Sequence, residues 1–441
     1  MQRFLVKTFG CRASQADGAA LESALAAKGL GAATDLDDAD LVVLNTCTVT
    51  ATADDELRQT VRRMHRSRPD AQIVVTGCYA QRSPREIAAL PGVSLVVGNS
   101  HKTQIPDLVS MPVDFHGELH VGDIHVGDIW AQHDFLAAPV KDALGGRTRP
   151  NLKIQDGCGN RCSFCIIPYV RGRSRSAPAE DVVAQVRALA AKYREVVLSG
   201  INLGRWGREL AFDNGGRLRL VDLIQRLLNE TPIERLRLSS VEPMDFSDAL
   251  LDLMAGSPRI AKHVHAPLQS GSDTVLRRMH RKYRPRHYED RIRQARERMP
   301  DCAVGADVMT GFPGETEAEF EDSRAFIDSL PFTYLHVFTY SARPGTPAAE
   351  SPGQVPIEIR KQRTHVLRDL AQRKNLAYRR SMLGKSLSAV TIEDGRMALS
   401  GNYLKVTLAR PREANCLVDV AIGGLTADGV HEAGMLPVLA G

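Results

Sequence analysis

The sequence predicts an α/β protein with three parts: an amino-terminal domain with a parallel sheet, a central incomplete β/α barrel and a small carboxy-terminal β-barrel. Three observations lead to this prediction. Short apolar strands alternate with helical stretches over the first hundred residues, a second alternation begins near residue 150, and short β-like runs separated by glycine and charged residues end the chain. A chain of 441 residues is long enough for about three domains.

The first domain is expected to contain four parallel strands with helices between them. The strands are expected at residues 4–10, 41–46, 73–77 and 94–98, and the helices at 17–28 and 54–68. Cys11, Cys47 and Cys78 directly follow the first three strands. Ligands of a parallel sheet gather beyond the carboxyl ends of its strands, so these distant cysteines are expected to share a metal rather than to be isolated buried thiols.

A connector is expected between the first domain and the barrel. Its residues are rich in proline, glycine, histidine and aspartate, and the string at 120–124 is repeated at once at 125–129. This composition is typical of a surface linker with local strand character. The expected boundaries are 1–100 for the first domain, 101–148 for the linker, 149–354 for the barrel, 355–382 for a basic connecting helix and 383–441 for the last domain.

Six strand and helix units are expected in the barrel. The strands are expected at 152–155, 195–199, 235–239, 261–265, 303–309 and 334–339, and the helices at 179–193, 219–228, 246–255, 288–298 and 315–329. A complete barrel of this kind has eight strands, so one side should be open and able to admit a large substrate. Beyond the basic helix, β-like runs at 387–392, 403–409 and 417–422 predict a small β-barrel.

The composition is that of a soluble globular protein, with 43% hydrophobic and 25% charged residues. No run of eighteen apolar residues predicts a membrane span, and the first residues do not resemble a signal peptide. Eight cysteines in such a chain are too few for a disulfide scaffold, and their grouping suits metal ligation in a reducing compartment, which predicts a cytoplasmic protein. The net charge of +5 is compatible with nucleic-acid binding and equally with an ordinary, slightly basic enzyme.

Three cysteines lie close together after the first expected barrel strand. Cys158, Cys162 and Cys165 form a Cys-x3-Cys-x2-Cys run with Phe164 before the last thiol. Three thiolates on a four-iron cluster leave one iron open to a small molecule. A small zinc site is the alternative, but zinc usually requires a fourth ligand at short spacing, and the nearest upstream histidine is His133. The run therefore favours an iron–sulfur cluster.

This spacing resembles that of the radical S-adenosylmethionine (SAM) enzymes. Through residue 172 the string is similar to the methylthiotransferase family, and the similarity extends over nearly the whole chain. The resemblance implies a six-unit partial barrel and a carboxy-terminal TRAM domain, a module associated with RNA. It also implies two [4Fe–4S] clusters, with SAM as methyl donor and radical source. Cys158, Cys162 and Cys165 would hold the radical cluster, while Cys11, Cys47 and Cys78 would hold an auxiliary cluster that delivers sulfur.

Contacts to SAM are expected where the barrel strands end. The candidates are Phe164, Ser199, Gly200, Asn202, Glu242, Gln269, Ser270 and Asp307. Glycines at such turns let the backbone approach a ligand, although a strand-to-helix turn alone also explains them, and Phe164 is equally compatible with a core position. Cys302 and Cys416 fit neither set and are expected to be structural.

Basic residues that could contact phosphates form three groups. They are Arg171, Arg173 and Arg175; Arg277, Arg278, Arg281 and Lys282; and Lys361, Arg363, Arg368, Arg373, Lys374, Arg379 and Arg380. A solvated charged face is the alternative. Together with the small β-barrel they favour an RNA substrate.

Five strings resemble the branch of the family that acts on threonylcarbamoyladenosine at position 37 of tRNA. They are found at 10–15, 165–169, 198–204, 237–243 and 402–406. The resemblance implies a monomeric transferase that acts on C2 of this adenosine, with the tRNA anticodon stem-loop and an electron-donor protein as partners and no membrane. The rivals are methylthiolation of isopentenyladenosine 37 or of a ribosomal-protein aspartate, simple RNA methylation, and a non-catalytic iron–sulfur RNA sensor.

Overall fold

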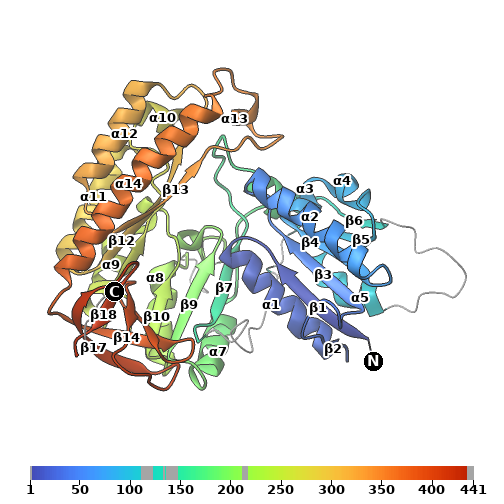
Figure 1. Cartoon of the computed structure of the whole chain (residues 1–441), viewed down its shortest axis with the longest axis horizontal. Helices are drawn as coiled ribbons and strands as arrows, with labels where there is room; N and C mark the ends of the chain where they lie inside the picture. Colours follow the sequence, from blue (N-terminus) through green and yellow to red (C-terminus); the bar gives the residue numbers. More distant parts are fainter. Residues whose placement is uncertain (1, 111–122, 133–134, 136–147, 211–216, 435–441) are drawn as a thin grey trace, which may run out of the picture.

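The computed structural model describes residues 2–110, 123–132, 135, 148–210 and 217–434. It contains the three expected parts (Figure 1): an amino-terminal sheet in blue, a central barrel from green to orange, and a carboxy-terminal β-barrel in red. The predicted fold class is therefore confirmed.

The amino-terminal domain is a six-stranded parallel sheet with strand order β2-β1-β3-β4-β5-β6. Its strands are β1 (Arg3–Thr8), β2 (Gly31–Ala32), β3 (Leu41–Thr46), β4 (Gln72–Gly77), β5 (Val93–Gly98) and β6 (Asp123–His125). Its helices are α1 (Arg12–Ala27), α2 (Ala51–Ser67), α3 (Cys78–Arg82), α4 (Pro84–Ala88) and α5 (Ile105–Ser110), with the 3₁₀ turn η1 (Lys102–Gln104). Every residue of β3 is buried, as expected for a central parallel strand covered on both faces.

The duplicated string of the expected linker has a structural role. Residues 120–122 of the first copy lie outside the described residues, but Asp123 and Ile124 belong to β6, which extends the sheet beside β5. In the second copy, the backbone N–H of Gly127 donates to Ser100 Oγ at 2.9 Å. Ile129 is buried in the 3₁₀ turn η2 (Ile129–Ala131). The repeat thus attaches this segment to the first domain.

The central part is a barrel of six parallel strands. These are β7 (Asn151–Asp156), β9 (Glu195–Gly200), β10 (Arg235–Leu238), β11 (His263–His265), β12 (Ala303–Thr310) and β13 (Tyr334–Thr339). They form two sheets, β10-β9-β7 and β11-β12-β13, joined where Leu236 pairs with Ile260. The short β8 (Arg175–Ser176) lies antiparallel on the outer edge of β7. The barrel is therefore open between β7 and β13, as the strand count predicts.

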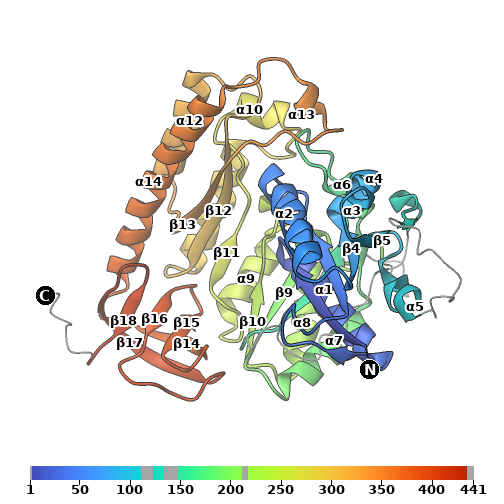
Figure 2. The same ribbon diagram turned by 45° about the vertical axis from the view of Figure 1, so that its right-hand side comes forward.

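Helices cover the outside of the barrel (Figures 1 and 2). The helices of this part are α6 (Ile167–Arg171), α7 (Ala179–Ala190), α8 (Leu220–Glu230), α9 (Asp248–Gly256), α10 (Asp273–Arg278), α11 (Pro285–Arg298), α12 (Glu317–Ser329) and α13 (Pro347–Glu350), with the 3₁₀ turns η4 (Leu203–Arg205) and η5 (Pro243–Asp245). Of these, α6 faces the amino-terminal domain, where Val170 packs against Cys78. The helix α8 illustrates why they form, because it buries Leu220, Leu223, Ile224 and Leu227, which share one helical face.

The amino-terminal domain spans the open side of the barrel. On the β7 side, Asn151 Nδ2 donates to the carbonyl of Arg12, 2.7 Å away. On the β13 side, Arg343 pairs with the buried Asp54 of α2 at 2.8 Å. The domain therefore contacts both edges of the opening and covers it.

The carboxy-terminal part begins with the long helix α14 (Ile357–Ser381) and ends in a closed barrel. Its strands are β14 (Ser386–Ile392), β15 (Met397–Ser400), β16 (Lys405–Thr407), β17 (Leu417–Leu425) and β18 (Val430–Glu432). Arg237 of β10 is fully buried, pairs with Glu195 at 2.8 Å, and donates to the carbonyls of Ser400 and Gly401. These contacts hold the carboxy-terminal barrel against β10 of the central barrel.

None of the helices in the described ranges combines the length and the apolar character needed to cross a bilayer.

Candidate active site

The three cysteines of the Cys-x3-Cys-x2-Cys run lie in the loop between β7 and α6. The loop is anchored where the N–H of Cys158 donates to the carbonyl of Gly172 at 3.0 Å. Burial raises the pKa of the Cys165 thiol to about 12, and the nearby Cys162 and Cys158 thiols add to this effect. Burial and Cys162 likewise raise the pKa of Cys158. Isolated thiolates of Cys158 and Cys165 are therefore unfavourable here, and a bound metal would stabilise them.

Two polar side chains contact these thiols. The Asn202 Nδ2 atom lies 3.6 Å from Cys158 Sγ, and the Arg281 Nη1 atom lies 3.3 Å from Cys162 Sγ. Arg281 also forms an ion pair with Glu242. Donors directed at sulfur stabilise the charge of a thiolate that binds a metal. Two expected SAM contacts, Asn202 and Glu242, are thus placed beside the cysteines.

A cavity of about 180 Å³ opens beside the same loop, between the barrel and the amino-terminal domain. Three of its lining residues, Phe164, Cys165 and Gln269, were predicted as SAM contacts or cluster ligands. The other lining residues come from both domains and were not predicted: Val49, Thr50, Ile166, Ile167, Met309, Phe338, Thr339, Tyr340, Ser341 and Arg343. The Oε1 atom of Gln269 is buried without a hydrogen-bond partner. A cavity lined by apolar groups and a few polar ones is typical of a small-molecule site.

The remaining candidates lie elsewhere. Ser199 Oγ donates to the carbonyl of Leu152, and Gly200 leaves room for the side chain of Gln155. Ser270 Oγ pairs with Ser323 at 2.8 Å, which fastens its loop to α12. Asp307 contacts two histidines rather than the cysteines.

The second set of cysteines lies at the carboxyl ends of β1, β3 and β4. Cys47 and Cys78 are buried and Cys11 is exposed. Burial raises the pKa of Cys47 to about 12, and the Cys78 and Cys11 thiols contribute, so the three are close together. Gly10 has a φ of +96°, and a side chain there would place its Cβ 2.8 Å from Cys47 Sγ. Glycine at this position therefore keeps the space beside the thiols open.

The two sets approach each other across the domain interface. Cys78 packs against Ile166 and Val170, and Ile166 directly follows Cys165 in the chain. The Asn99 Nδ2 atom bridges the interface, because it lies 3.6 Å from Cys78 Sγ and 2.7 Å from the carbonyl of Val170. These contacts bring Cys78 of one set next to the residue that follows Cys165 of the other.

The spacing of the thiols bears on the choice between zinc and a cluster. Thiolates around one zinc ion, with Zn–S bonds of about 2.3 Å, must lie within about 4 Å of each other. Over the described ranges, the one group of three metal-ligating atoms that all lie within 4.8 Å of one another is His265, Asp307 and His336. Neither cysteine set in the described ranges is that compact, so neither has the thiol spacing of a site for a single zinc ion.

A buried ionic cluster of Asp17, Lys102, Lys153, Asp156 and Arg171 lies between the domains and was not predicted. Asp17 of α1 forms ion pairs with Lys102, Lys153 and Arg171, and Asp156 pairs with the latter two. Burial would raise the pKa of Asp17 and Asp156, but the neighbouring cations outweigh it and hold both below the ordinary value.

The structure corrects part of the expectation that the three basic groups contact phosphates. Arg171 and Arg175 are buried, as are Arg281, Arg363 and Arg379, so none of the five belongs to a phosphate-binding surface. The sequence gives little signal of the cluster, because the strand that carries Lys153 is mostly polar and yet mostly buried. The partner of Lys153, Asp17, is 136 positions away.

Comparisons with known proteins agree with this geometry. Residues 3–98 match the model described as "Uncharacterized protein family UPF0004", and residues 152–327 match the radical SAM superfamily. The chain is 36% identical to the threonylcarbamoyladenosine tRNA methylthiotransferase MtaB of Aquifex aeolicus, over 94% of this chain and 99% of that protein. The chain belongs to the radical SAM methylthiotransferase family.

Other relatives of this methylthiotransferase carry names for two different tRNA adenosines. The MtaB protein of Bacillus subtilis is 41% identical, over 75% of this chain and 71% of its own. The tRNA-2-methylthio-N(6)-dimethylallyladenosine synthase of Novosphingobium aromaticivorans is 34% identical, over 89% and 87%. Among solved structures, the radical SAM methyltransferase TsrM of Kitasatospora setae has a TM-score of 0.57 at 17% identity, over 79% of this chain and 77% of that chain, which shows likeness of fold alone.

Arg281 offers a test of the radical site in this methylthiotransferase. Arg281→Lys keeps the charge but cannot reach both Glu242 and Cys162, because lysine lacks the planar fork. We expect SAM cleavage to slow by about 10- to 100-fold with the iron content unchanged, measured as 5′-deoxyadenosine formed by reconstituted protein. The matched control is Arg277→Lys, since Arg277 has an exposed side chain paired with Asp273. Equal rates in wild type and Arg281→Lys would contradict the role of this contact.

Proposed function

We propose that this methylthiotransferase adds a methylthio group to C2 of N6-threonylcarbamoyladenosine 37 in tRNA. The observation that carries the proposal is the meeting of two cysteine sets at one domain interface, beside a cavity lined by Cys165. The relatives support this choice of substrate, since the two MtaB proteins are 36% and 41% identical and the dimethylallyladenosine synthase 34%.

In this proposal each cysteine set holds a [4Fe–4S] cluster. Cys158, Cys162 and Cys165 are the ligands of the radical cluster, and Cys11, Cys47 and Cys78 those of the auxiliary one. When bound, these clusters supply the open iron that SAM coordinates, the electron that cleaves SAM, and the sulfur that is transferred. A separate protein supplies the electron.

The chain's own residues bind and shield the reactants. Asn202 and Arg281 donate toward the thiolates of the radical set. Phe164 and Gln269 line the cavity in which the adenosyl group is to be bound. The amino-terminal domain covers the open side of the barrel and excludes water from the reacting groups.

The carboxy-terminal β-barrel is proposed to bind the tRNA together with exposed basic residues along α14, the helix that leads into it. Lys361, Arg373 and Arg380 of α14 remain exposed, unlike Arg363 and Arg379 of the same helix. Exposed cations of this kind pair with phosphates and make binding weaken as salt rises.

The test is nucleoside analysis of tRNA from cells with and without the gene. The expected result is loss of the 2-methylthio derivative of threonylcarbamoyladenosine in the deletion strain, with the unmethylthiolated nucleoside accumulating. Loss of a methylthio-dimethylallyl nucleoside instead would assign the rival substrate. Intact tRNA profiles with an altered ribosomal-protein mass would reject tRNA as the substrate, and a product heavier by CH2 alone would reject sulfur insertion.

A further inference from the structure

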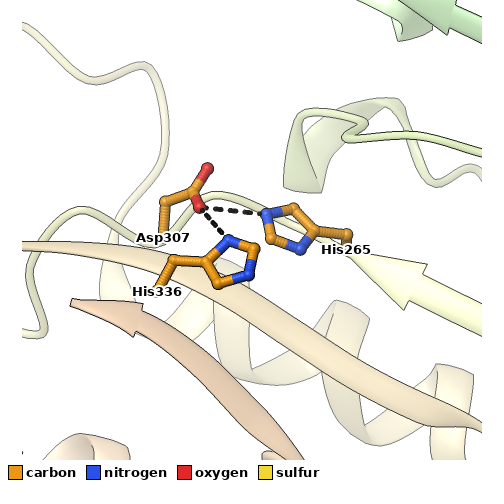
Figure 3. A group of neighbouring side chains, drawn as sticks. All are labelled: His265, Asp307 and His336. Atoms are coloured by element: carbon orange, nitrogen blue, oxygen red, sulfur yellow. Dashed lines mark hydrogen bonds and ion pairs between the residues drawn. The ribbon is translucent and has the colours of Figure 1, made fainter. Parts of the chain in front are cut away.

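Two histidines and an aspartate from three neighbouring strands point toward one another (Figure 3). His265 belongs to β11, Asp307 to β12 and His336 to β13, and Asp307 is directly opposite His336 in the strand ladder. His336 Nδ1 lies 3.1 Å from Asp307 Oδ1, and His265 Nε2 lies 3.2 Å from the same oxygen. The strands thus bring two imidazole nitrogens to one carboxylate oxygen.

This group lies on the same face of its strands as the active-site cavity. Asp307 is two residues before Met309 on β12, and side chains two apart point to the same side of a sheet. The same holds for His336 and Phe338 on β13, and both Met309 and Phe338 line the cavity. Two residues of strand span about 7 Å. His265 is buried, whereas the His336 side chain is 60% exposed, so the group has one packed side and one open side.

Tyr334 holds the ring of His265 in place. Its hydroxyl lies 2.8 Å from His265 Nδ1 and 2.7 Å from His263 Nε2. Gly305 leaves the space for the tyrosine, since a Cβ there would lie 2.0 Å from its ring. Histidines that bind metals almost always use their second ring nitrogen in a hydrogen bond, which orients the ring and fixes its tautomer. His265 has such a partner in Tyr334.

The direction of these hydrogen bonds decides what His265 presents to Asp307. When the Tyr334 hydroxyl donates to His263, it accepts from His265 Nδ1, and His265 Nε2 then carries a lone pair. A lone pair and a carboxylate oxygen 3.2 Å apart repel each other unless a cation lies between them. In the opposite direction His265 Nε2 would carry a proton, yet this buried nitrogen makes no hydrogen bond of good geometry although Asp307 is within reach. The geometry therefore favours the form of His265 that can bind a metal.

The distances in the group suit ligands of one ion. Zinc bonds to nitrogen and oxygen are about 2.0–2.2 Å long, so two ligand atoms at a tetrahedral angle lie about 3.3 Å apart. The contacts of His265 and His336 with Asp307 Oδ1 are 3.2 and 3.1 Å, and the three ligand atoms all lie within 4.8 Å of one another. Because His336 is largely exposed, its ring can rotate to close the remaining distance and carry its proton on Nε2.

The charges of the group also suit a cation. One carboxylate and two neutral imidazoles carry a net negative charge, which a divalent ion would compensate. Tyr403 stacks on His263 with ring centres 4.4 Å apart, and the Arg237 guanidinium lies 5.5 Å from the centre of the Tyr403 ring. Arg237 is paired with Glu195 at 2.8 Å, however, so its charge is already compensated.

We propose that His265 Nε2, Asp307 Oδ1 and His336 Nδ1 bind a Zn²⁺ ion, in addition to the metals held by the two cysteine sets. Two histidines and one carboxylate are a ligand set of zinc sites that keep one position open. The open position lies on the exposed side of the group, where it can bind water. This site goes beyond the proposed function, because no cysteine belongs to it.

The test is zinc binding by the full-length protein after both clusters have been reconstituted. The protein is freed of loosely bound metal by gel filtration and titrated with zinc chloride without oxygen. We expect one equivalent of zinc in addition to about eight irons. X-ray absorption at the zinc edge should show only nitrogen and oxygen neighbours, at about 2.0–2.2 Å. Zinc held by cysteines would instead show sulfur at about 2.3 Å, and this result would overturn the proposal.

Two variants separate the ligands from the residue that positions them. His336→Phe removes an exposed ligand. Loss of an outer-shell partner costs about 10- to 100-fold in metal affinity, so loss of a ligand should weaken zinc binding by about 100-fold or more. Tyr334→Phe keeps all three ligands but removes the hydroxyl beside His265, and should weaken binding by about 10- to 100-fold with the same zinc neighbours. Both variants should retain the wild-type iron content.

The control is His365→Phe. His365 is also an exposed histidine beside an aspartate, 3.4 Å from Asp369, but the two lie on the outer helix α14. This variant should bind zinc as wild type does. Absence of zinc binding by wild type, or equal zinc affinity of wild type and His336→Phe, would show that the group is a set of hydrogen-bonded side chains and not a metal site. The measurement uses no RNA, so an error in the proposed tRNA substrate would not change its outcome.

Discussion

The Cys47→Ser variant is expected to lose the methylthio product completely while it still cleaves SAM to 5′-deoxyadenosine. A serine hydroxyl does not ionise in place of the thiolate, so the auxiliary set loses one of its three ligands. The radical set lies in another loop and keeps all three. Iron should fall from about eight to about four per chain, measured by iron analysis and by mass spectrometry of the nucleoside products.

The matched control is Cys302→Ser. Cys302 is as buried as Cys47, but it packs in the hydrophobic core of the barrel beside a helix carbonyl and belongs to neither set. This variant should retain both the iron and the product. A Cys47→Ser protein that still holds about eight irons and forms product would show that Cys47 is not a ligand.

The second large effect is expected from Asp17→Asn. Asp17 is 1% exposed and is shared by Lys102, Lys153 and Arg171, so an amide there leaves three buried cations with Asp156 as the one carboxylate of the cluster. Breaking a buried pair on one side costs about 3–5 kcal/mol. We expect the free energy of unfolding to fall by that amount, measured by urea denaturation at pH 7. Because the cluster joins two domains, the amino-terminal domain should also become sensitive to proteolysis.

The pH dependence of this effect has a definite sign. The folded-state pKa of Asp17 lies below its ordinary value of 3.8, so its contribution is fully present above about pH 4 and is lost as the pH falls. The difference between wild type and variant should therefore shrink in acid. The control Asp55→Asn removes an exposed partner of Arg58 and should cost less than about 1 kcal/mol. Equal stability of wild type and Asp17→Asn at pH 7 would contradict the structural role of the cluster.

The strands could be predicted because the pattern of apolar residues in each one reflects how it is buried. Continuous apolar runs such as that of β3 require burial on both faces, and parallel strands bring the residues that follow them to one edge. The positions of Cys11, Cys47 and Cys78 could be predicted from this rule alone. The strands β15 and β18 were missed, because runs of three or four residues in a small closed barrel carry little periodicity.

The polar interior could not be predicted, because it depends on partners far apart in the chain. Arg281 was assigned to a basic surface, yet it is buried against Glu242, 39 positions away. His265 and His336 alternate with apolar residues along their strands, a pattern that places them on one face without revealing that Asp307 lies between them. The pairing of the strands brings the three together, because β12 lies between β11 and β13 and Asp307 is directly opposite His336 in the ladder.

The rigid helix α14 fixes the distance between the two ends of the molecule that it connects. Its 25 residues span about 37 Å. Near its start Arg363 holds Glu315, and near its end Arg379 binds three carbonyls of the last domain. Because the helix is rigid, one inserted residue would advance the last domain by about 1.5 Å and turn it by about 100°. If the last domain binds tRNA as proposed, the length of α14 helps to set which nucleotide reaches the cysteines, even though the helix need not touch that nucleotide.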